Sequence, residues 1–456
     1  MFVSGQAKKG VSGTPRGFAC TAGVDRSLWS RLARLELMRS LLGILLLAGT
    51  LRAQLTPGQK QLNLDSFEKV WTTIRDQHWE KNPGGLDWQA IHEEFRPRIE
   101  KADSIDATRA LLREMLDRLH QTHFAIIPST VYSDVDVTLG DGSPGLDLRV
   151  IDGQAVVTRV DPGSPAEKAG VKLGWAVVSA GGKDLAPVIE KLKSDPSMHE
   201  LMLERAVLAR LSGPEGGKLH VVFLDAANRN VALDLDLGDP RGIPAKFGNL
   251  PPQYVWFEAK KIDGAQYVAF NMFLDLPRIM GNFGDAVNSC LKCYGLIIDL
   301  RGNPGGIGGM AMGMAGFLVD QAGRKLGTMY MRGATINFAV LPRPEVFKGP
   351  VAVLVDGSSA STSEIFAGGL KDLGRARIFG TKSAAAALPS IIDKLPNGDG
   401  FQYAMANYIS DGGKPLEGNG VIPDQEVKLT RKALLAGHDP VVDAAIEWIQ
   451  KQRGPK

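Results

Sequence analysis

The sequence is poor in the residues that build metal, redox and nucleotide sites. Its 456 residues include only three cysteines and seven histidines. No His-x-x-x-His occurs and Cys-x-x-Cys occurs once, so the ligand spacing of a typical zinc site is absent. The Gly-Lys-Ser/Thr that completes a phosphate-binding loop is absent as well. We therefore expect a protein that works without a cofactor or a metal ion.

The main part of the chain also lacks a long apolar run and an excess of positive charge. Residues 1–53 hold eight lysines and arginines against two acidic residues, so this leader carries a net charge of +6 and the rest carries −3. A body without a basic patch does not indicate a nucleic-acid partner. No segment is long and apolar enough to be a transmembrane helix.

The leader has the three parts of a secretory signal peptide. Arg39 supplies a positive start, Leu41 to Ala48 is apolar, and the small residue Ala53 marks a cleavage site. Met38 is then a candidate for the true start. We expect export to a periplasm or to the cell exterior, with no stable membrane anchor after cleavage.

Two cysteines lie beyond the leader, Cys290 and Cys293. Their Cys-x-x-Cys spacing is found in redox motifs. The pair lies at the end of an expected helix in a chain predicted to be exported, where a local disulfide or simple packing is the alternative. The position favours a structural role for the two cysteines, as a local disulfide or as packed side chains.

The chain length predicts about three domains. Apolar residues at helical spacing come first, short strands follow, and strands alternating with helices come last. We predict an α/β fold with these parts: a leader with the signal peptide (1–53), an N-terminal helical domain (54–135), a β-rich domain (136–237), a linker rich in proline and glycine (238–253), an α/β core (254–432) and a C-terminal helix (433–456).

One serine lies where a buried strand turns into a helix. Val351 to Val355 is apolar, a Gly/Ser turn follows and an amphipathic helix begins near Thr362, so Ser361 stands at the turn. Free N–H groups at a helix N-terminus suit an oxyanion, and a serine placed there can attack a carbonyl. The alternative is structural, because Ser361 and Glu364 also match a capping box.

A glycine-rich turn follows a second buried strand. The strand is expected at Gly295 to Leu300, and the turn ends at Gly305 and Gly306. Adjacent glycines let the backbone turn tightly and point N–H groups into a cleft. Such a turn also suits an oxyanion.

Two motifs in the β-rich part resemble a PDZ domain of the type embedded in proteases. They are Gly145-Leu146-Asp147-Leu148 and the element from Gly163 to Gly170, which a Gly-Trp-x-Val strand follows. A PDZ domain binds a peptide as an extra strand, and loop N–H groups hold the terminal carboxylate of the peptide. The resemblance implies that residues 145–148 bind a peptide. The alternative is a small β-rich module without peptide affinity.

The glycine turn and the serine turn together resemble the tail-specific (carboxy-terminal processing) serine peptidases, over roughly residues 60–430. The resemblance implies a ClpP/crotonase-like core with an N-terminal helical segment and an inserted PDZ-like domain. It also implies cleavage of peptide bonds, with Ser361 as the nucleophile. An N–H of Gly305 or Gly306, with that of Thr362, is the implied oxyanion hole.

One position departs from the pattern of that family. Processing peptidases pair the serine with a downstream lysine, at a position where this chain has Ala386. Lys382 is offset from it by four residues. A methyl group cannot accept a proton, so the usual Ser–Lys pair is not expected.

The chain is similar instead to the tricorn-core branch. That branch uses a histidine near the end of the helical segment, a hydroxyl residue just before it and a late glutamate. His123, Thr122 and Glu417 match these positions. The resemblance implies that His123 takes the proton from Ser361. Glu417 would orient His123 directly or through Thr122, and His120 is the competing histidine.

We expect an exported serine endopeptidase that acts on peptides or proteins, recruited through their C-termini. Two alternatives stay open. The first is a catalytically silent protein that binds an apolar ligand or a C-terminal peptide, because the alanine-rich segment from residue 384 resembles the interphotoreceptor retinoid-binding proteins of the same superfamily. The second is a Ser–Lys peptidase that uses Lys382.

Overall fold

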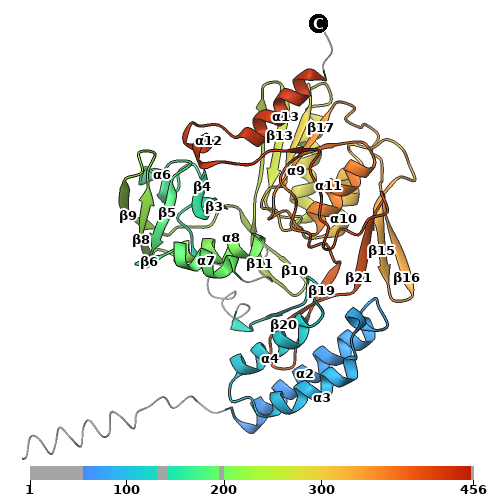
Figure 1. Cartoon of the computed structure of the whole chain (residues 1–456). Helices are drawn as coiled ribbons and strands as arrows, with labels where there is room; N and C mark the ends of the chain where they lie inside the picture. The colour runs from blue at the N-terminus through green and yellow to red at the C-terminus, as the bar shows by residue number, and fades with distance from the viewer. Residues whose placement is uncertain (1–54, 131–140, 195–199, 453–456) are drawn as a thin grey trace, which may run out of the picture. The chain divides into compact units, whose positions relative to one another are not determined.

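The computed structural model describes residues 55–130, 141–194 and 200–452, and Figure 1 shows how its elements follow one another. The predicted signal peptide lies outside the described residues. Among the helices that are described, none is long and apolar enough to cross a membrane. The architecture is mixed α/β, as predicted: helices come first, a β-rich unit next and a mostly parallel sheet with helices last.

Three helices open the described chain and bury apolar residues that recur at helical spacing. Each begins after a residue whose side chain accepts a backbone N–H of the first turn, namely Thr56, Asp87 and Ser104. The elements are α2 (Pro57–Gln77), the short η1 (Pro83–Gly85), α3 (Trp88–Glu100) and α4 (Ile105–Asp117).

Strand pairing and a buried ion pair join this helical segment to the C-terminal part of the chain. β1 (Ala125–Ile127) pairs antiparallel with β20 (Gly400–Ala404). Arg109 on α4 donates to both carboxylate oxygens of Asp399, at 2.7 and 3.0 Å, and Asp399 is fully buried. Because a buried charge is tolerated only when it is paired, these contacts fix the segment that leads into β1.

The β-rich unit is built on a sheet with the strand order β3-β4-β5-β8-β9, so β3 lies at an edge. Helix α8 packs along β3 and contributes apolar residues to the core of the unit. Its elements are β2 (Asp141–Gly142), β3 (Leu146–Ile151), β4 (Gln154–Val160), α6 (Pro165–Lys168), β5 (Ala176–Ala180), β6 (Lys183–Asp184), α7 (Ala186–Lys193), α8 (Glu200–Leu208), η2 (Ala209–Leu211), β7 (Gly213–Pro214), β8 (Lys218–Leu224) and β9 (Asn230–Asp236).

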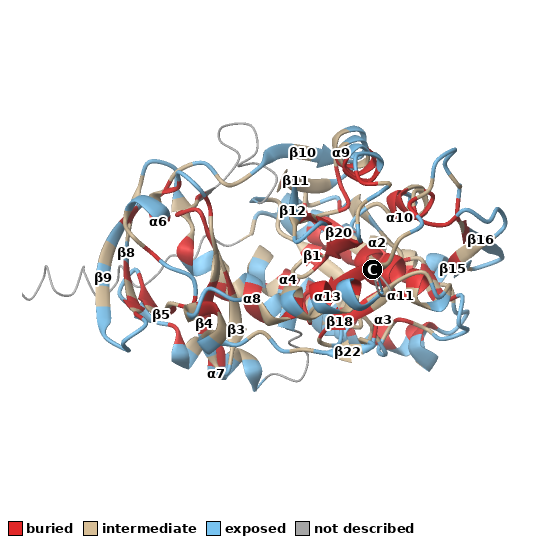
Figure 2. Ribbon diagram, turned by 90° about the horizontal axis from the view of Figure 1, so that it is seen from above, coloured by how far each residue is buried: buried red, intermediate tan, exposed pale blue. Residues whose placement is uncertain are grey.

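The central sheet has the order β12-β13-β14-β17-β18-β22, antiparallel at β12/β13 and parallel elsewhere. Alternate residues of its strands face opposite layers: Ile298 packs with α9, α10 and α11, and Ile297 packs with α13. In Figure 2, buried residues lie on one side of helices such as α9, and exposed residues lie on the other. The elements are β12 (Phe257–Ile262), β13 (Ala265–Phe270), α9 (Leu276–Asn288), β14 (Leu296–Asp299), α10 (Gly308–Ala315), β17 (Val351–Val355), α11 (Thr362–Asp372), β18 (Arg377–Gly380), β22 (Gln425–Glu426) and α13 (Pro440–Lys451).

Two smaller sheets complete this part of the chain. One has the order β16-β15-β21 and the other β1-β20-β19. Helix α12 (Arg431–Leu435) follows β22, and its Leu434 is buried against the β-rich unit. The C-terminal stretch therefore holds two helices, where one was predicted. The strands are β15 (Lys325–Met331), β16 (Ala334–Ala339), β19 (Ser390–Lys394) and β21 (Ala406–Ser410).

The stretch predicted to be a linker, 238–253, is largely a β-hairpin. β10 (Ile243–Phe247) pairs antiparallel with β11 (Leu250–Val255). Both strands of this two-stranded sheet are edges, where a proline without an N–H is tolerated. The stretch predicted to be a linker thus contains regular structure that its prolines and glycines did not indicate.

Cys290 and Cys293 form a disulfide just after α9, which is one of the two structural outcomes expected for this pair.

Candidate active site

Ser361 connects β17 to α11 in a backbone conformation that is rare for a residue with a side chain. Its φ is 54° and its ψ is −117°. Such a conformation costs about 1–3 kcal/mol and persists only when neighbouring contacts enforce it. The strand–turn–helix predicted from the sequence is present, and the serine stands at its tightest point.

The glycine turn packs directly against this serine. Gly305 has a φ of 95°, and a Cβ added to it would lie 2.7 Å from both Ser361 Cβ and Thr362 N. Gly306 has a φ of 141°, and its Cβ would lie 2.2 Å from the carbonyl oxygen of Phe273. Only glycine fits at either position, because a Cβ at 305 would clash with the serine turn and a Cβ at 306 would clash with the backbone of Phe273.

The hydrogen bonds distinguish the two glycine N–H groups. Gly305 N–H donates to Asn303 Oδ1 at 2.9 Å and is therefore occupied. Within the described residues, no recorded hydrogen bond uses the N–H of Gly306 or of Thr362, and Thr362 Oγ1 donates to Gly306 O at 2.8 Å. Gly306 is exposed. The pair free to hold an oxyanion is thus Gly306 with Thr362.

His123 lies just before β1 and contacts the residue that precedes it. Thr122 Oγ1 is 2.7 Å from His123 Nδ1 and donates to Glu417 Oε2 at 2.9 Å. Glu417 Oε1 also accepts the Thr122 N–H at 2.9 Å. The three residues predicted to act together are therefore joined in one chain of hydrogen bonds across 295 positions of sequence.

This chain of bonds assigns the tautomer of the histidine. The Thr122 hydroxyl has one proton and a carboxylate can only accept, so that proton points at Glu417. Nδ1 of His123 must then carry the hydrogen that Thr122 accepts, and Nε2 is left with a lone pair. Burial lowers the pKa of His123 to about 4, so the ring is neutral at neutral pH. Such a ring can act as a proton acceptor.

A short strip of chain, residues 383–387, links the serine to the glutamate. Ser361 N–H donates to Ala386 O at 2.7 Å, and Ala387 N–H donates to Glu417 Oε2 at 3.0 Å. Ala386 is buried, whereas Lys382 is exposed. His120, the competing histidine, is exposed as well.

The predicted peptide-binding residues lie on the β-rich unit, apart from this cluster. The side chains of the unit bond to backbone groups of the edge strand β3: Asp147 Oδ1 accepts the Leu148 N–H at 2.9 Å, and Glu204 Oε1 accepts the Val150 N–H at 3.3 Å. Arg149 donates to Leu148 O at 2.9 Å.

The same side chains reach the loop that precedes Ser361. Arg149 Nε donates to Asp356 Oδ2 at 3.0 Å, and Ser358 Oγ donates to Glu204 Oε2 at 2.5 Å. Burial raises the pKa of Glu204 to about 8, although Arg149 beside it favours the charged form. The Gly302 N–H also donates to Asp356.

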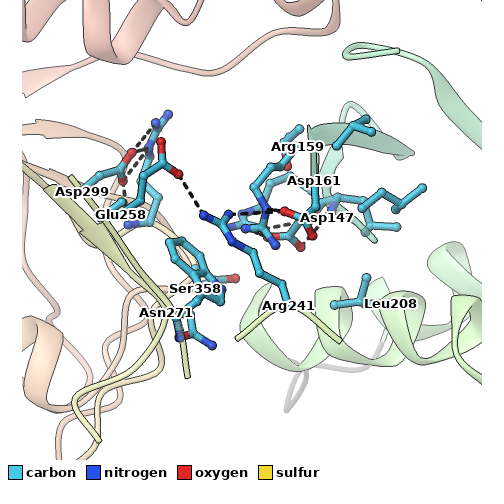
Figure 3. A pocket seen from close by; sticks show the side chains of 18 of the residues that line it. Asp147, Arg159, Asp161, Leu208, Arg241, Glu258, Asn271, Asp299 and Ser358 are labelled. Carbon is cyan, nitrogen blue, oxygen red and sulfur yellow. Dashed lines mark hydrogen bonds and ion pairs between the residues drawn. The ribbon is translucent and has the colours of Figure 1, made fainter. Parts of the chain in front are cut away.

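A cavity of about 1150 Å³ lies between the β-rich unit and the central sheet. Figure 3 shows Arg241 reaching across it, bonded to Glu258 and to Asp161. Its guanidinium lies 4.0 Å from the ring centre of Trp256. Ser358 lines the cavity, and Ser361 does not. Among the described residues, no group of three histidine, cysteine or acidic side chains could hold a metal ion.

Two segments of the chain match known protein families. Residues 266–427 match Peptidase family S41, and residues 63–117 match the Tricorn protease C1 domain. The first match spans both the glycine turn and the serine turn, so this part of the chain is similar to peptidases of family S41. Together with the relatives below it supports a serine-type peptidase, as predicted.

Three curated relatives match most of the chain. The identity is 24% over 370 residues with the carboxyl-terminal-processing protease of Picosynechococcus sp., covering 80% of this chain and 83% of that protein. It is 23% over 351 residues with the carboxy-terminal processing protease CtpA of Bacillus subtilis, covering 76% and 68%. It is 24% over 405 residues with tricorn protease homolog 2 of Streptomyces coelicolor, covering 84% of this chain but 32% of that protein.

Two solved structures share the fold. The photosystem II D1 C-terminal processing protease aligns with a TM-score of 0.53 at 21% identity, covering 85% of this chain and 99% of that chain. Mature CPAF aligns with a TM-score of 0.59 at 13% identity, covering 87% and 99%. At these identities the likeness concerns the fold alone.

Sequence reasoning missed the ion pairs that connect the β-rich unit to the serine turn. Arg149 and Asp356 are 207 positions apart, and neither belongs to a short motif. Glu364 was assigned only a capping role, although it is fully buried. Its burial beside a polar turn is not visible in the sequence.

Proposed function

We propose that this protein is an endopeptidase in which Ser361 is the nucleophile and His123 is the base. The observation that carries the proposal is the Thr122–Glu417 contact, which leaves Nε2 of His123 able to accept a proton. A histidine packed by chance would not be expected to have its tautomer fixed by a threonine that a glutamate holds through two bonds.

The reaction follows from this assignment. His123 Nε2 accepts the proton of Ser361 as Oγ bonds to the peptide carbonyl carbon, and the carbonyl oxygen becomes an oxyanion. The N–H groups of Gly306 and Thr362 hold that oxyanion. The imidazolium returns its proton to the leaving amine as the C–N bond breaks. Water, deprotonated by His123, then releases the acyl group from Ser361.

Glu417 stabilises the charged imidazole through Thr122 during these steps. When Nε2 is protonated, His123 Nδ1–H still donates to the threonine oxygen, and the carboxylate holds the threonine proton. Lys382 has no part in this scheme, because its side chain is exposed and the buried position of the strip belongs to Ala386.

We further propose that the β-rich unit is a PDZ-like domain that binds the C-termini of protein substrates, on a chain whose core is ClpP/crotonase-like. Two observations support the first part: β3 is an edge strand, and the two PDZ-like motifs pack together. A Cβ on Gly145 would lie 2.3 Å from Ser164 Cβ. The leader supports export to a periplasm or to the cell exterior.

Labelling with a fluorophosphonate tests the catalytic assignment. Wild type should be labelled, Ser361→Ala should not, and His123→Ala should react about 10³-fold more slowly, since it lacks the proton acceptor. Lys382→Ala and His120→Ala are the matched controls and should react like wild type.

Three results would contradict the assignment. Labelling that persists in Ser361→Ala would place the nucleophile elsewhere. Loss of labelling in Lys382→Ala alone would favour a Ser–Lys mechanism. A wild type that neither labels nor cleaves a peptide library, yet binds an apolar ligand, would be a silent binding protein.

A further inference from the structure

Glu364 lies in the first turn of α11, three residues after the nucleophile, and its side chain is completely buried. Its carboxylate accepts four hydrogen bonds. Oε1 accepts from Ser383 Oγ at 2.5 Å and from the Ala385 N–H at 2.9 Å. Oε2 accepts from the Ala386 N–H at 3.0 Å and from the Ser361 N–H at 3.1 Å.

This is more than a capping box requires. In a capping box, the glutamate of the first turn accepts one N–H, that of the residue preceding the helix. Here the Ser361 N–H is that bond, and the other three donors come from residues 383–386, about 20 positions away in sequence. A carboxylate that only capped a helix would be free to face water.

The extra bonds tie the serine turn to the strip that reaches Glu417. Oε2 of Glu364 receives the N–H of Ser361 and the N–H of Ala386 on the same atom. The next residue of the strip, Ala387, donates to Glu417. Glu364 therefore connects the 383–387 strip to Ser361, and Glu417 connects the same strip to Thr122 and His123.

We propose that Glu364 is a positioning residue for hydrolysis: its carboxylate keeps the strained Ser361 turn and the 383–387 strip in the one geometry that presents Ser361 Oγ to His123. The inference rests on the proposed function. A displacement of about 1 Å at such a site costs on the order of 10²-fold in rate. A residue that holds both the Ser361 turn and the 383–387 strip therefore affects the rate of the chemical step directly.

The role requires the ionised form. All four partners donate hydrogen bonds, and a carboxylate offers only acceptors. A protonated acid or an amide has a hydrogen of its own, which would point at one of these four donors. The main influences on the charge of Glu364 are its burial, which raises the pKa to about 7, and the hydrogen bonds from Ser383, Ala386, Ala385 and Ser361, which lower it. These are also the groups that face it from the strip and from its own helix.

The test compares Glu364→Gln with wild type in the full chain, using fluorophosphonate concentration series to separate the maximal labelling rate from the half-saturating concentration. We expect the maximal rate to fall about 100-fold and the half-saturating concentration to change less than about threefold. Ile449→Val is the control: it removes one methylene from the buried face of α13, on the other layer of the sheet, and should lower stability without changing labelling.

The pH dependence of wild-type labelling needs no variant. We expect the rate to fall as the pH drops through about 7, whereas protonation of His123 alone would place the fall near 4. A wild-type profile that stays flat down to pH 5 would overturn the proposal, and so would a Glu364→Gln protein that labels like wild type. If wild type is not labelled at any pH, the proposed function itself fails, which is a different result.

Discussion

The helical segment and the β-rich unit are joined to the C-terminal α/β part of the chain in different ways. The helical segment shares backbone hydrogen bonds through β1 and β20 and is fixed by the buried Arg109–Asp399 pair. The β-rich unit is held by side chains around a large cavity: Arg149, Glu204 and Arg241 reach across, and Leu434 packs from α12. We call the first connection the helical joint; it includes His123. We call the second the side-chain joint; it includes β3, the candidate peptide-binding edge.

The difference suggests that the fold holds the position of His123 more firmly than the position of β3. A proton acceptor must lie within hydrogen-bond distance of the nucleophile, and backbone pairing beside His123 limits its movement. An edge strand that admits a peptide must exchange partners, and side-chain contacts can be exchanged without breaking a backbone ladder. The two joints are compatible with the roles that we propose for His123 and for β3.

Breaking the ion pair of the helical joint should have the largest effect on stability. Asp399→Asn removes the buried charge partner of Arg109 and leaves it only the exposed Asp106, and we expect a loss of about 3 kcal/mol in the free energy of unfolding. Urea unfolding measures it, and labelling should fall with the fraction of folded helical segment. A loss below about 1 kcal/mol would show that backbone pairing alone holds this joint.

The two joints should also respond to pH with opposite signs. The folded pKa of His123 is about 4 against 6.5 in an unfolded chain, so its contribution to stability is lost as the pH falls from 6.5 to 4. The folded pKa of Glu204 is about 8 against 4.5, so stability is lost as the pH rises from 4.5 to 8. The effects are on the order of 3 kcal/mol for His123 and 5 kcal/mol for Glu204 when fully developed.

Single variants separate these two contributions. Relative to His123→Ala, wild type should lose unfolding free energy between pH 6.5 and 4.5. Relative to Glu204→Gln, wild type should lose it between pH 5 and 8. Differences that run in the same direction for both variants would refute the contrast between the joints.

The smallest expected effect is that of Arg241, at the side-chain joint. Arg241→Ala removes the ion pairs with Glu258 and Asp161 and the stacking on Trp256, all partly open to the cavity. We expect about 1 kcal/mol of destabilisation, and labelling at Ser361 close to that of wild type. If thermal unfolding shows a loss as large as that of Asp399→Asn, the two joints are equally rigid and the comparison does not hold.

The sequence predicted the elements around the site well and the contacts between them poorly. The strand, turn and helix around Ser361 follow from apolar spacing within 20 residues, which is local information. The choice between Gly305 and Gly306 depended on Asn303, whose amide oxygen occupies one N–H. No spacing rule indicates which way that side chain turns.

Long-range pairs were invisible for the same reason. Arg109 and Asp399 are 290 positions apart, and each alone resembles an ordinary surface charge. His123 and Glu417 were proposed through a family resemblance, because a histidine after a helix and a glutamate in a polar turn carry no signal by themselves. Their proximity depends on β1 entering a sheet whose other strands come from the far end of the chain.

The bonds that β3 makes with its own side chains have a consequence for how the free protein behaves in a crowded solution. An uncovered strand edge invites pairing with any extended chain nearby, including another copy. Here Asp147, Arg149 and Glu204 occupy backbone groups of that edge in advance. An incoming segment must replace these bonds one for one, so it gains little from its backbone and must be selected by its side chains or its terminus.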